Sequence, residues 1–212
     1  MKQREVRLIV FAKAPAGGRV KTRLARGIGM AAATAWYRRS LLRTLTMLRR
    51  AGIEHEIASA PSAPVFHAAS NVSGKIATQA LGDLGRRMAM AAKTARGPCV
   101  IVGADIPGLS ASIVARAREA VKRYDLVLGP ARDGGYYLVG VKSPAHVFRL
   151  YERVRWSSEY ALADTLANAP KHWRIAFLPL LDDVDVVADL KIAAQPPASA
   201  FVSTTVSPGR SR

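Results

Sequence analysis

The sequence predicts an α/β fold with a largely parallel central sheet, and two patterns support this prediction. Short apolar runs of strand length alternate with longer segments of helical periodicity, which is typical of layered α/β proteins. Acidic or glycine-bearing segments follow several of these runs, where open α/β sheets bind their ligands. The chain has 212 residues, half of them hydrophobic, so we expect one domain with a sizeable core over residues 1–194.

The expected elements can be placed in order along the chain. The apolar run 6–11 is the first strand, a helix begins near Val20, and a long helix over 31–50 ends before Gly52. Further strands are expected at residues 53–58, 75–78, 99–102, 126–128, 136–141 (at an angle to the main sheet) and 173–178. Further helices are expected at 84–95, at 158–168 and from the cap Ser110 through Arg123. Residues 61–71 are expected to form a surface loop, and 195–212, rich in Pro, Ser, Thr and Gly, a flexible tail.

The composition bears on the class of partner. A formal net charge of +17 is compatible with nucleic-acid binding, but the arginines of residues 31–50 are spaced as on a solvated helix face. There is no aromatic-studded basic strand, zinc-finger or basic-zipper pattern, so we do not expect nucleic acid as the main partner. No apolar run approaches the roughly 20 residues of a membrane span, and the N-terminal run is too short for a signal peptide. A single cysteine, Cys99, excludes an internal disulfide, and we expect a cytoplasmic protein.

The segment 11–24, FAKAPAGGRVKTRL, predicts a phosphate-binding loop. It follows the first strand, and its glycines allow a tight turn and a close approach to a ligand. The start of the following helix would present free N–H groups. Four cations in such a short segment repel one another unless an anion is bound, which favours phosphate binding over a plain strand–helix connection. The residues concerned are Lys13, Gly17, Gly18, Arg19, Lys21 and Arg23.

Two further segments carry glycine and aspartate near expected strand ends. In QALGDLGRRM, residues 79–88, Gly82 and Asp83 could close over a base or ribose, or Asp83 could simply cap the next helix. In GADIPGL, residues 103–109, Asp105 follows the strand at 99–102 in a turn stiffened by Pro107. A carboxylate there can bind Mg²⁺ or Mn²⁺, which neutralises phosphate oxygens, and we favour this over a capping role.

Acidic groups recur in the second half of the chain. In GPARDGGYY, residues 129–137, Asp133 could contact a sugar hydroxyl, an acceptor or a metal, although Asp-Gly is also a common turn signal. Near the end, Asp182, Asp183 and Asp185 suit a second metal contact or a solvated turn. The four histidines show no zinc-binding spacing, and Trp156 is interpreted as a core residue at a strand-to-helix junction.

In this order, the motifs resemble a bacterial glycosyltransferase family catalogued as radical-SAM/selenodomain-associated or arsenosugar-biosynthesis transferases. The resemblance spans residues 7–190 and rests on AKAP, GRVKTRL, GDLGRRM, GADIPGL, GPARDGGYYLVG, a Trp-Ser step and DVD. It implies the GT-A, or nucleotide-diphospho-sugar transferase, fold: three α/β/α layers around a mostly parallel mixed sheet. The guanylyltransferases of molybdenum cofactor and of phospholactate are relatives by fold. The chain departs from the family pattern in Gly17, Ala104 and Ser158, and it has no second acid two residues from Asp105.

The residue patterns and the resemblance together give the expected roles of single residues. Asp105, Asp133 and Lys21 are the expected catalytic residues, with Asp105 and Asp185 on a Mg²⁺ or Mn²⁺ ion. The nucleotide would be bound by Lys13, Gly17, Gly18, Arg19, Lys21, Arg23, Gly82 and Asp83. The acceptor would lie beside Asp133, Gly134, Gly135 and Tyr136.

We therefore expect a transferase that takes a nucleotide sugar and a small-molecule acceptor, with metal-assisted loss of a phosphate leaving group. The alternatives are a nucleotidyltransferase that releases pyrophosphate, for which four loop cations would suit a triphosphate, and a nucleotide-binding protein without catalytic activity. A nucleic-acid-binding module is the remaining class. The sequence does not identify the base, the sugar, the acceptor or the oligomeric state.

Overall fold

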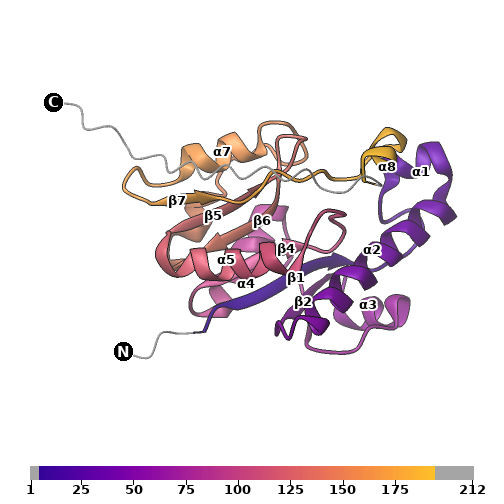
Figure 1. Cartoon of the computed structure of the whole chain (residues 1–212), viewed down its shortest axis with the longest axis horizontal. Coiled ribbons are helices and arrows are strands. Elements are labelled where there is room, and N and C mark those ends of the chain that lie inside the picture. Colours follow the sequence, from indigo (N-terminus) through magenta and orange to yellow (C-terminus); the bar gives the residue numbers. More distant parts are fainter. Residues whose placement is uncertain (1–4, 194–212) are drawn as a thin grey trace.

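A seven-stranded mixed sheet runs through the centre of the molecule, as seen in a computed structural model that describes residues 5–193 (Figure 1). The strand order is β3-β2-β1-β4-β6-β5-β7. Only β6 runs antiparallel to its neighbours, β4 and β5. The strands are β1 (Arg7–Lys13), β2 (Glu56–Ala60), β3 (Ile76–Thr78), β4 (Cys99–Gly103), β5 (Leu126–Pro130), β6 (Tyr136–Val141) and β7 (Ile175–Phe177). The predicted mostly parallel sheet is confirmed, but the strand at 136–141 belongs to the main sheet and does not stand at an angle outside it.

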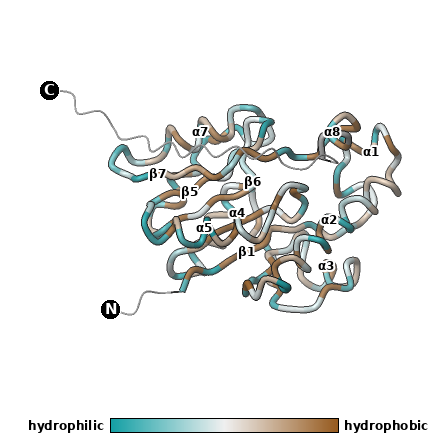
Figure 2. The backbone as a smooth tube through the Cα atoms, in the orientation of Figure 1, coloured by the Kyte–Doolittle hydropathy of each residue, from teal (hydrophilic) through white to brown (hydrophobic). Residues whose placement is uncertain are grey.

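Helices cover both faces of the sheet, which confirms the three-layer α/β/α prediction. Alternate residues of the strands point to opposite faces. Leu8 and Val10 join a buried cluster with α2, α3 and α5, whereas Ile9 joins a second cluster with α4 and α6. The brown, hydrophobic stretches in Figure 2 follow the central strands accordingly. The helices are α1 (Thr22–Ile28), α2 (Met30–Arg50), α3 (Ala63–Ser70), α4 (Leu84–Ala95), α5 (Ala111–Arg123), α6 (Val147–Leu150), α7 (Ala161–Asn168) and α8 (Val187–Ala193), with a 3₁₀ turn at Pro144–His146.

The predicted surface loop at 61–71 is wrong, because this segment contains α3. Ser62 caps the helix by accepting a hydrogen bond from the Val65 N–H, and a proline stands in the first turn, where it is tolerated. Phe66 is fully buried and holds the helix on the sheet. The serine and the proline that made the segment look like a loop therefore mark the start of a helix, and Phe66 anchors that helix in the core.

The helix expected near Val20 is short and begins at Thr22. Lys21 precedes it in the left-handed conformation, with φ 44° and ψ 48°, and Gly29, at φ 84°, separates α1 from α2. None of the helices within residues 5–193 is long and apolar enough to cross a membrane. The tail expected at 195–212 lies outside the described residues.

The order of the strands creates a crevice at one edge of the sheet. The chain leaves β1 toward β2 and β3 on one side, while β4 pairs with β1 on the other side. Loops that follow β1 and β4 therefore diverge, and such a switch point is where open α/β sheets bind ligands. Residues 178–186, which connect β7 to α8, cross this same edge and reach α1 (Figure 1).

Candidate nucleotide-binding site

A cleft of about 620 Å³ opens at the C-terminal ends of β1 and β4. Its lining comes from the loop after β1, the start of α4, the turn after β4, the β5–β6 turn, residues 156–161 and the 183–185 segment. Each motif on which the family resemblance rests contributes at least one lining residue. The tertiary structure therefore brings these separate motifs to one site.

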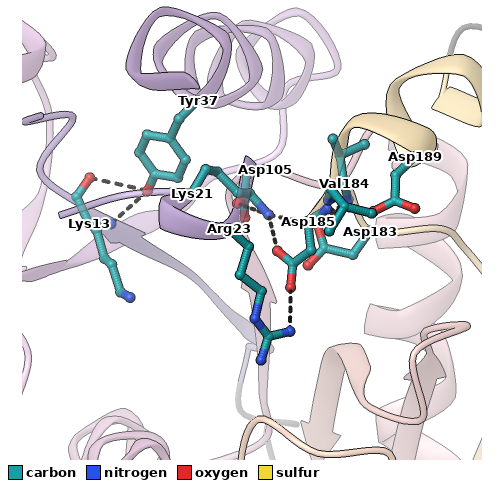
Figure 3. A network of polar contacts seen from close by, with 10 residues as sticks. Lys13, Lys21, Arg23, Tyr37, Asp105, Asp183, Val184, Asp185 and Asp189 are labelled. Atoms are coloured by element: carbon teal, nitrogen blue, oxygen red, sulfur yellow. Dashed lines mark hydrogen bonds and ion pairs between the residues drawn. The ribbon is translucent and has the colours of Figure 1, made fainter. Parts of the chain in front are cut away.

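Lys21 lines this cleft and lies at the centre of a carboxylate cluster (Figure 3). Its Nζ is 2.9 Å from Asp105 Oδ2, 2.8 Å from Asp183 Oδ1 and 3.3 Å from Asp185 Oδ1. Arg23 Nη1 lies 3.4 Å from the second oxygen of Asp185. Only 7% of the Lys21 side chain is exposed, so this ammonium is held within the protein and does not extend into solvent.

Burial and charge act against each other on the pKa values of this cluster. Burial by itself would lower the pKa of the Lys21 ammonium, but the Asp105 and Asp183 carboxylates outweigh it and raise that pKa above its ordinary value. Burial raises the pKa of the Asp183 carboxyl, and the nearby Asp105 carboxylate adds to this effect, whereas Lys21 opposes it. The cluster is therefore a crowded set of carboxylates that needs a cation between its members.

The turn after β4, which carries Asp105, is held in place from two sides. The backbone N–H of Ala104 donates to the Phe11 carbonyl at 3.2 Å, which continues the β1–β4 pairing to the residue before Asp105. Arg43, on α2, donates from Nη2 to the carbonyl of Ile106 at 3.2 Å and also to that of Pro107. Arg43 is thus a positioning residue for this turn. In the sequence it was only one of several arginines spaced as on a solvated helix face.

The 183–185 segment is fixed by the helix that follows it. Asp189 accepts hydrogen bonds from the backbone N–H groups of Asp185 and Val186, both at 2.8 Å, as an acid in the first turn of a helix commonly does. The helix α8 packs on α1 at Gly27, where any side chain would overlap Val187. Val184 and Leu24 share a small buried cluster there. Lys21 and the acids Asp183 and Asp185 therefore lie just before two helices that contact each other.

The end of β1 and the start of α4 form the opposite wall. The backbone N–H of Lys13 donates to Tyr37 Oη at 2.7 Å, and that hydroxyl donates back to the Lys13 carbonyl. Gln79 donates to the carbonyls of Ala12 and Ala58, and its Oε1 accepts from Arg87 Nη1 at 3.1 Å. Arg87 therefore presents its guanidinium in the cleft in a fixed position. In the sequence, Gln79 and Arg87 lie within the marked segment 79–88 but were not themselves predicted as site residues, and no motif marks Tyr37.

The β5–β6 turn and residues 156–161 form the far end of the cleft. Asp133 Oδ1 accepts a hydrogen bond from the Gly135 N–H at 2.9 Å. Gly134 has φ 83° and packs directly on the Glu159 backbone. Trp156 packs against the core, as expected, but it also lines the cleft. Among the described residues between 131 and 161, those that line the cleft include two carboxylates, Asp133 and Glu159, and no lysine or arginine.

The loop that carries Trp156 is held by an ion pair, which gives a pH-dependent prediction. Arg155 donates to Asp164 from its backbone N–H, Nε and Nη2 at 2.7–3.0 Å, and these hydrogen bonds lower the pKa of Asp164 to about 2. Because this value lies below the ordinary 3.8, the contribution to stability is complete above about pH 4 and is lost as the pH falls through about 2. An NMR titration of the Asp164 carboxyl should give this value and should return to about 3.8 in Arg155→Gln. A value near 3.8 in the wild-type protein would contradict the ion pair.

The structure brings together most, but not all, of the predicted site residues. Lining the cleft are Lys13, Lys21, Arg23, Asp105, Asp133, Gly135, Tyr136 and Asp185. Asp83 caps α4 by accepting from the Arg86 N–H at 2.7 Å, which corresponds to the capping alternative. Outside the lining are Gly17, Gly18, Arg19, Gly82, Asp83 and Gly134. Asp183, which the sequence marked only as part of an acidic run, lies closest to Lys21.

The donor set of the carboxylate cluster suits a hard divalent cation. Within residues 5–193, no group of three or more His, Cys, Asp or Glu side chains has the geometry of a metal site. The carboxylates of Asp105, Asp183 and Asp185 instead surround the Lys21 ammonium. Carboxylate oxygens are the ligands that Mg²⁺ and Mn²⁺ prefer, and an ammonium ion in their midst shows that the cluster accommodates a cation. The residue types therefore suit the metal ion that the sequence led us to expect, but their arrangement around Lys21 is not that of a metal site.

Solved structures share this fold. A candidate nucleotide-diphospho-sugar transferase from Desulfovibrio desulfuricans G20 is 30% identical, with a TM-score of 0.81 over 89% of this chain and 86% of its own. Rv0371c from Mycobacterium tuberculosis H37Rv, solved in complex with manganese, is 18% identical, with a TM-score of 0.52 over 90% and 98%. A 4-diphosphocytidyl-2C-methyl-D-erythritol synthase from Anaerococcus prevotii DSM 20548 is 11% identical, with a TM-score of 0.54 over 89% and 94%. The last two show likeness of fold alone.

One of two sequence comparisons identifies the family of this chain. No curated protein sequence matches the chain. A family model described as "Uncharacterized protein conserved in bacteria (DUF2064)" matches residues 44–158, more than half of the chain. The matched region includes Gln79, Arg87, Asp105 and Asp133 of the cleft. The chain therefore belongs to the DUF2064 family of bacterial proteins.

Proposed function

We propose that this protein is a transferase that takes its donor group from a nucleotide, with a nucleotide sugar as the donor and a hydroxyl-bearing small molecule as the acceptor. One observation supports this above all: a single cleft at the switch point of the sheet combines cations with a carboxylate cluster suited to a divalent metal. The relative from Desulfovibrio desulfuricans, itself a candidate nucleotide-diphospho-sugar transferase, adds support. The proposal includes the more specific resemblance to arsenosugar-biosynthesis transferases, because every motif that carries this resemblance contributes a residue to the same cleft.

On the donor side, positive charge would stabilise the phosphates. Lys13, Lys21, Arg23 and Arg87 all line the cleft. Asp105, Asp183 and Asp185 would hold a Mg²⁺ or Mn²⁺ ion, which would neutralise charge that develops on the phosphate leaving group. The protein residues would orient the donor and keep its phosphates among fixed cations as the bond to the sugar breaks.

On the acceptor side, the lining favours a neutral hydroxyl group over an anionic acceptor. Asp133 and Glu159 repel phosphates and carboxylates, while Ser157 offers a hydroxyl group. Asp133 is the candidate general base, because one of its carboxylate oxygens is held by the Gly135 N–H and the other can accept a proton from an acceptor hydroxyl.

Nucleotidyl transfer is the second candidate function, because four cations line the cleft and a triphosphate carries more negative charge than a diphosphate. Two of these cations already have acidic partners, since Lys21 contacts three carboxylates and Arg23 contacts Asp185. This pairing leaves less free positive charge than the sequence suggested. It favours the sugar nucleotide as donor.

A thermal-shift screen of nucleoside triphosphates and sugar nucleotides, with Mn²⁺ and with EDTA, tests the proposal. Binding to the native state stabilises it by about 2.7 kcal/mol at a ligand concentration one hundred times Kd, so a true donor raises Tm measurably. We expect the largest shift with a sugar nucleotide plus Mn²⁺. Mass spectrometry of the products then separates the candidates, because sugar transfer releases a nucleoside diphosphate and nucleotidyl transfer releases pyrophosphate. No shift with any nucleotide would contradict both candidates, and binding without turnover would indicate a non-catalytic nucleotide-binding protein.

A further inference from the structure

We propose that Arg87 binds a phosphate group of the donor, and that Gln79 positions the Arg87 guanidinium for this role without reducing its charge. The inference rests on the proposed function, which supplies the nucleotide. It goes further because the sequence assigned the phosphates to the loop after β1. In the segment 79–88 it suggested only a contact to a base or ribose, or a helix cap.

The charge of Arg87 is not offset by an acid. Its Nε donates to the backbone carbonyl of Asp83 at 3.2 Å, and its Nη1 donates to Gln79 Oε1 at 3.1 Å. Both acceptors are uncharged, and within residues 5–193 no carboxylate forms an ion pair with Arg87. Lys21 and Arg23, by contrast, line the same cleft and both contact acids. Arg87 therefore offers its full charge to an anion.

The guanidinium also keeps the donors that recognise phosphate. An arginine has five N–H bonds, and the two neutral acceptors use the one on Nε and one on Nη1. The other three, one on Nη1 and two on Nη2, donate to no group in the described part of the chain. They belong to a planar fork that matches two phosphate oxygens. Because Arg87 lines the cleft, a phosphate bound there can meet this fork.

Gln79 holds the guanidinium from the side of the sheet. Its Nε2 donates to the carbonyls of Ala12, at 3.3 Å, and Ala58, at 2.8 Å, which uses both of its N–H bonds. Since carbonyls only accept, the amide has one orientation, and Oε1 is left for Arg87. The backbone N–H of Gln79 donates to the Ser59 carbonyl at 2.9 Å, so both ends of this residue are fixed.

An amide suits this position better than a carboxylate. A glutamate in place of Gln79 would set an anion against the carbonyl oxygens of Ala12 and Ala58, and it would offset the charge of Arg87. The amide supplies a neutral acceptor instead. The arginine is therefore held in place while its charge remains available to a ligand.

The place of Arg87 in its helix is unfavourable for stability. It is the fourth residue of α4, and the first turn of this helix contains no acid. The N-terminal end of a helix carries partial positive charge, which opposes a cation there. An arginine that neither the helix nor an ion pair stabilises is expected where an anion binds.

Lys13 adds a second cation to the same wall of the cleft. It follows Ala12, the residue whose carbonyl Gln79 holds, and it lines the cleft. As with Arg87, ion pairs with Lys13 are absent among the residues that the structure describes. The positive charge that remains for an anion therefore lies on the wall formed by the end of β1 and the start of α4.

Pyrophosphate binding, measured by isothermal titration calorimetry, gives the first test, because this probe carries phosphates without a base or a sugar. Arg87→Gln should lower pyrophosphate affinity about 10- to 100-fold. The matched control is Arg86→Gln, which removes the same charge from the exposed neighbour outside the cleft lining and should change the affinity less than about threefold. Equal losses in the two variants, no loss in Arg87→Gln, or no binding by the wild-type protein overturns the inference.

Urea unfolding separates a ligand role from a structural one. Arg87→Gln should be at least as stable as the wild-type protein, because the change removes a cation that opposes the dipole of α4. A marked loss of stability in Arg87→Gln would show that the arginine mainly supports the fold, and it overturns the inference.

A double-mutant cycle tests the positioning role of Gln79. Gln79→Met should lower pyrophosphate affinity about 3- to 10-fold in the wild-type background, because the guanidinium loses the acceptor that orients it. In the Arg87→Gln background the same change should alter the affinity less than about twofold, since no arginine remains to be positioned. A purely structural role at the ends of β1 and β2 would give equal losses in both backgrounds. Gln79→Glu should bind pyrophosphate more weakly than Gln79→Met, and equal or tighter binding contradicts the need for a neutral acceptor.

A panel of nucleoside diphosphates distinguishes failure of this inference from failure of the proposed function. Nucleotide binding that Arg87→Gln leaves unchanged overturns the role of Arg87 and leaves the proposed function standing. Pyrophosphate binding that depends on Arg87, without binding of any nucleoside diphosphate, leaves the phosphate site standing and removes the nucleotide donor.

Discussion

Replacement of Asp105 by Asn is expected to lower kcat/KM by about 10²–10³, with little change in stability. Asp105 is the one carboxylate of the cluster that stands at the end of a central strand, where the sheet and Arg43 hold it rigid. The amide keeps the shape of the side chain but loses the charge that a divalent cation needs. Metal-dependent nucleotide binding should fall together with the activity.

The folded state should tolerate this change because Lys21 keeps two other carboxylate partners, Asp183 and Asp185. Removal of the Asp105 charge also takes away one of the influences that raise the pKa of Asp183, so repulsion within the cluster decreases. The matched control is Asp182→Asn, since Asp182 is a neighbouring acid that pairs with Arg132 at 2.6 Å and does not line the cleft. Steady-state kinetics and urea unfolding of both variants make the comparison. Comparable loss of activity in the two variants would contradict the assigned role of Asp105.

Replacement of Gly134 by Ala is expected to destabilise the protein by about 2–4 kcal/mol. Gly134 has φ 83°, a region that L side chains rarely adopt, and a Cβ would overlap the backbone carbonyl oxygen and Cα of Glu159. Its carbonyl also accepts from the Leu162 N–H at 3.0 Å, so the turn cannot move without loss of this link to α7. Urea unfolding measures the change in free energy.

Gly135→Ala is the matched control on the next residue. Gly135 has no positive φ, and its Cβ would lie nearest to Asp133 Oδ1, at 3.2 Å, at the end of a side chain that can move. We expect a cost below about 1 kcal/mol for this variant. Similar costs for the two alanine variants would show that the contact between the β5–β6 turn and residue 159 is not the constraint. Gly134 would then be important for another reason.

Local signals in the sequence were enough for several elements. The helices α4 and α5 were predicted with their observed bounds, because Asp83 and Ser110 cap them and apolar residues recur at helical spacing. The strand β4 and the position of Asp105 at its end followed from one short apolar run and a glycine. The prediction for 61–71 failed because proline, serine and asparagine there mark the two ends of α3 rather than a loop.

The sequence alone determined which residue types are available for the site: a basic glycine loop, an acid after a central strand and an acidic run near residue 183. It could not show that Lys21 and Asp183, 162 positions apart, would meet at 2.8 Å, or that Arg19 would lie outside the cleft lining. Nor could it mark Tyr37, which contacts the backbone of Lys13, or show that Gln79 would bond to the carbonyl of Ala58 and hold Arg87 in the cleft. Caps and periodicity act within a few residues of each other. The convergence of distant side chains depends on strand order and helix packing, and only the tertiary structure decides these.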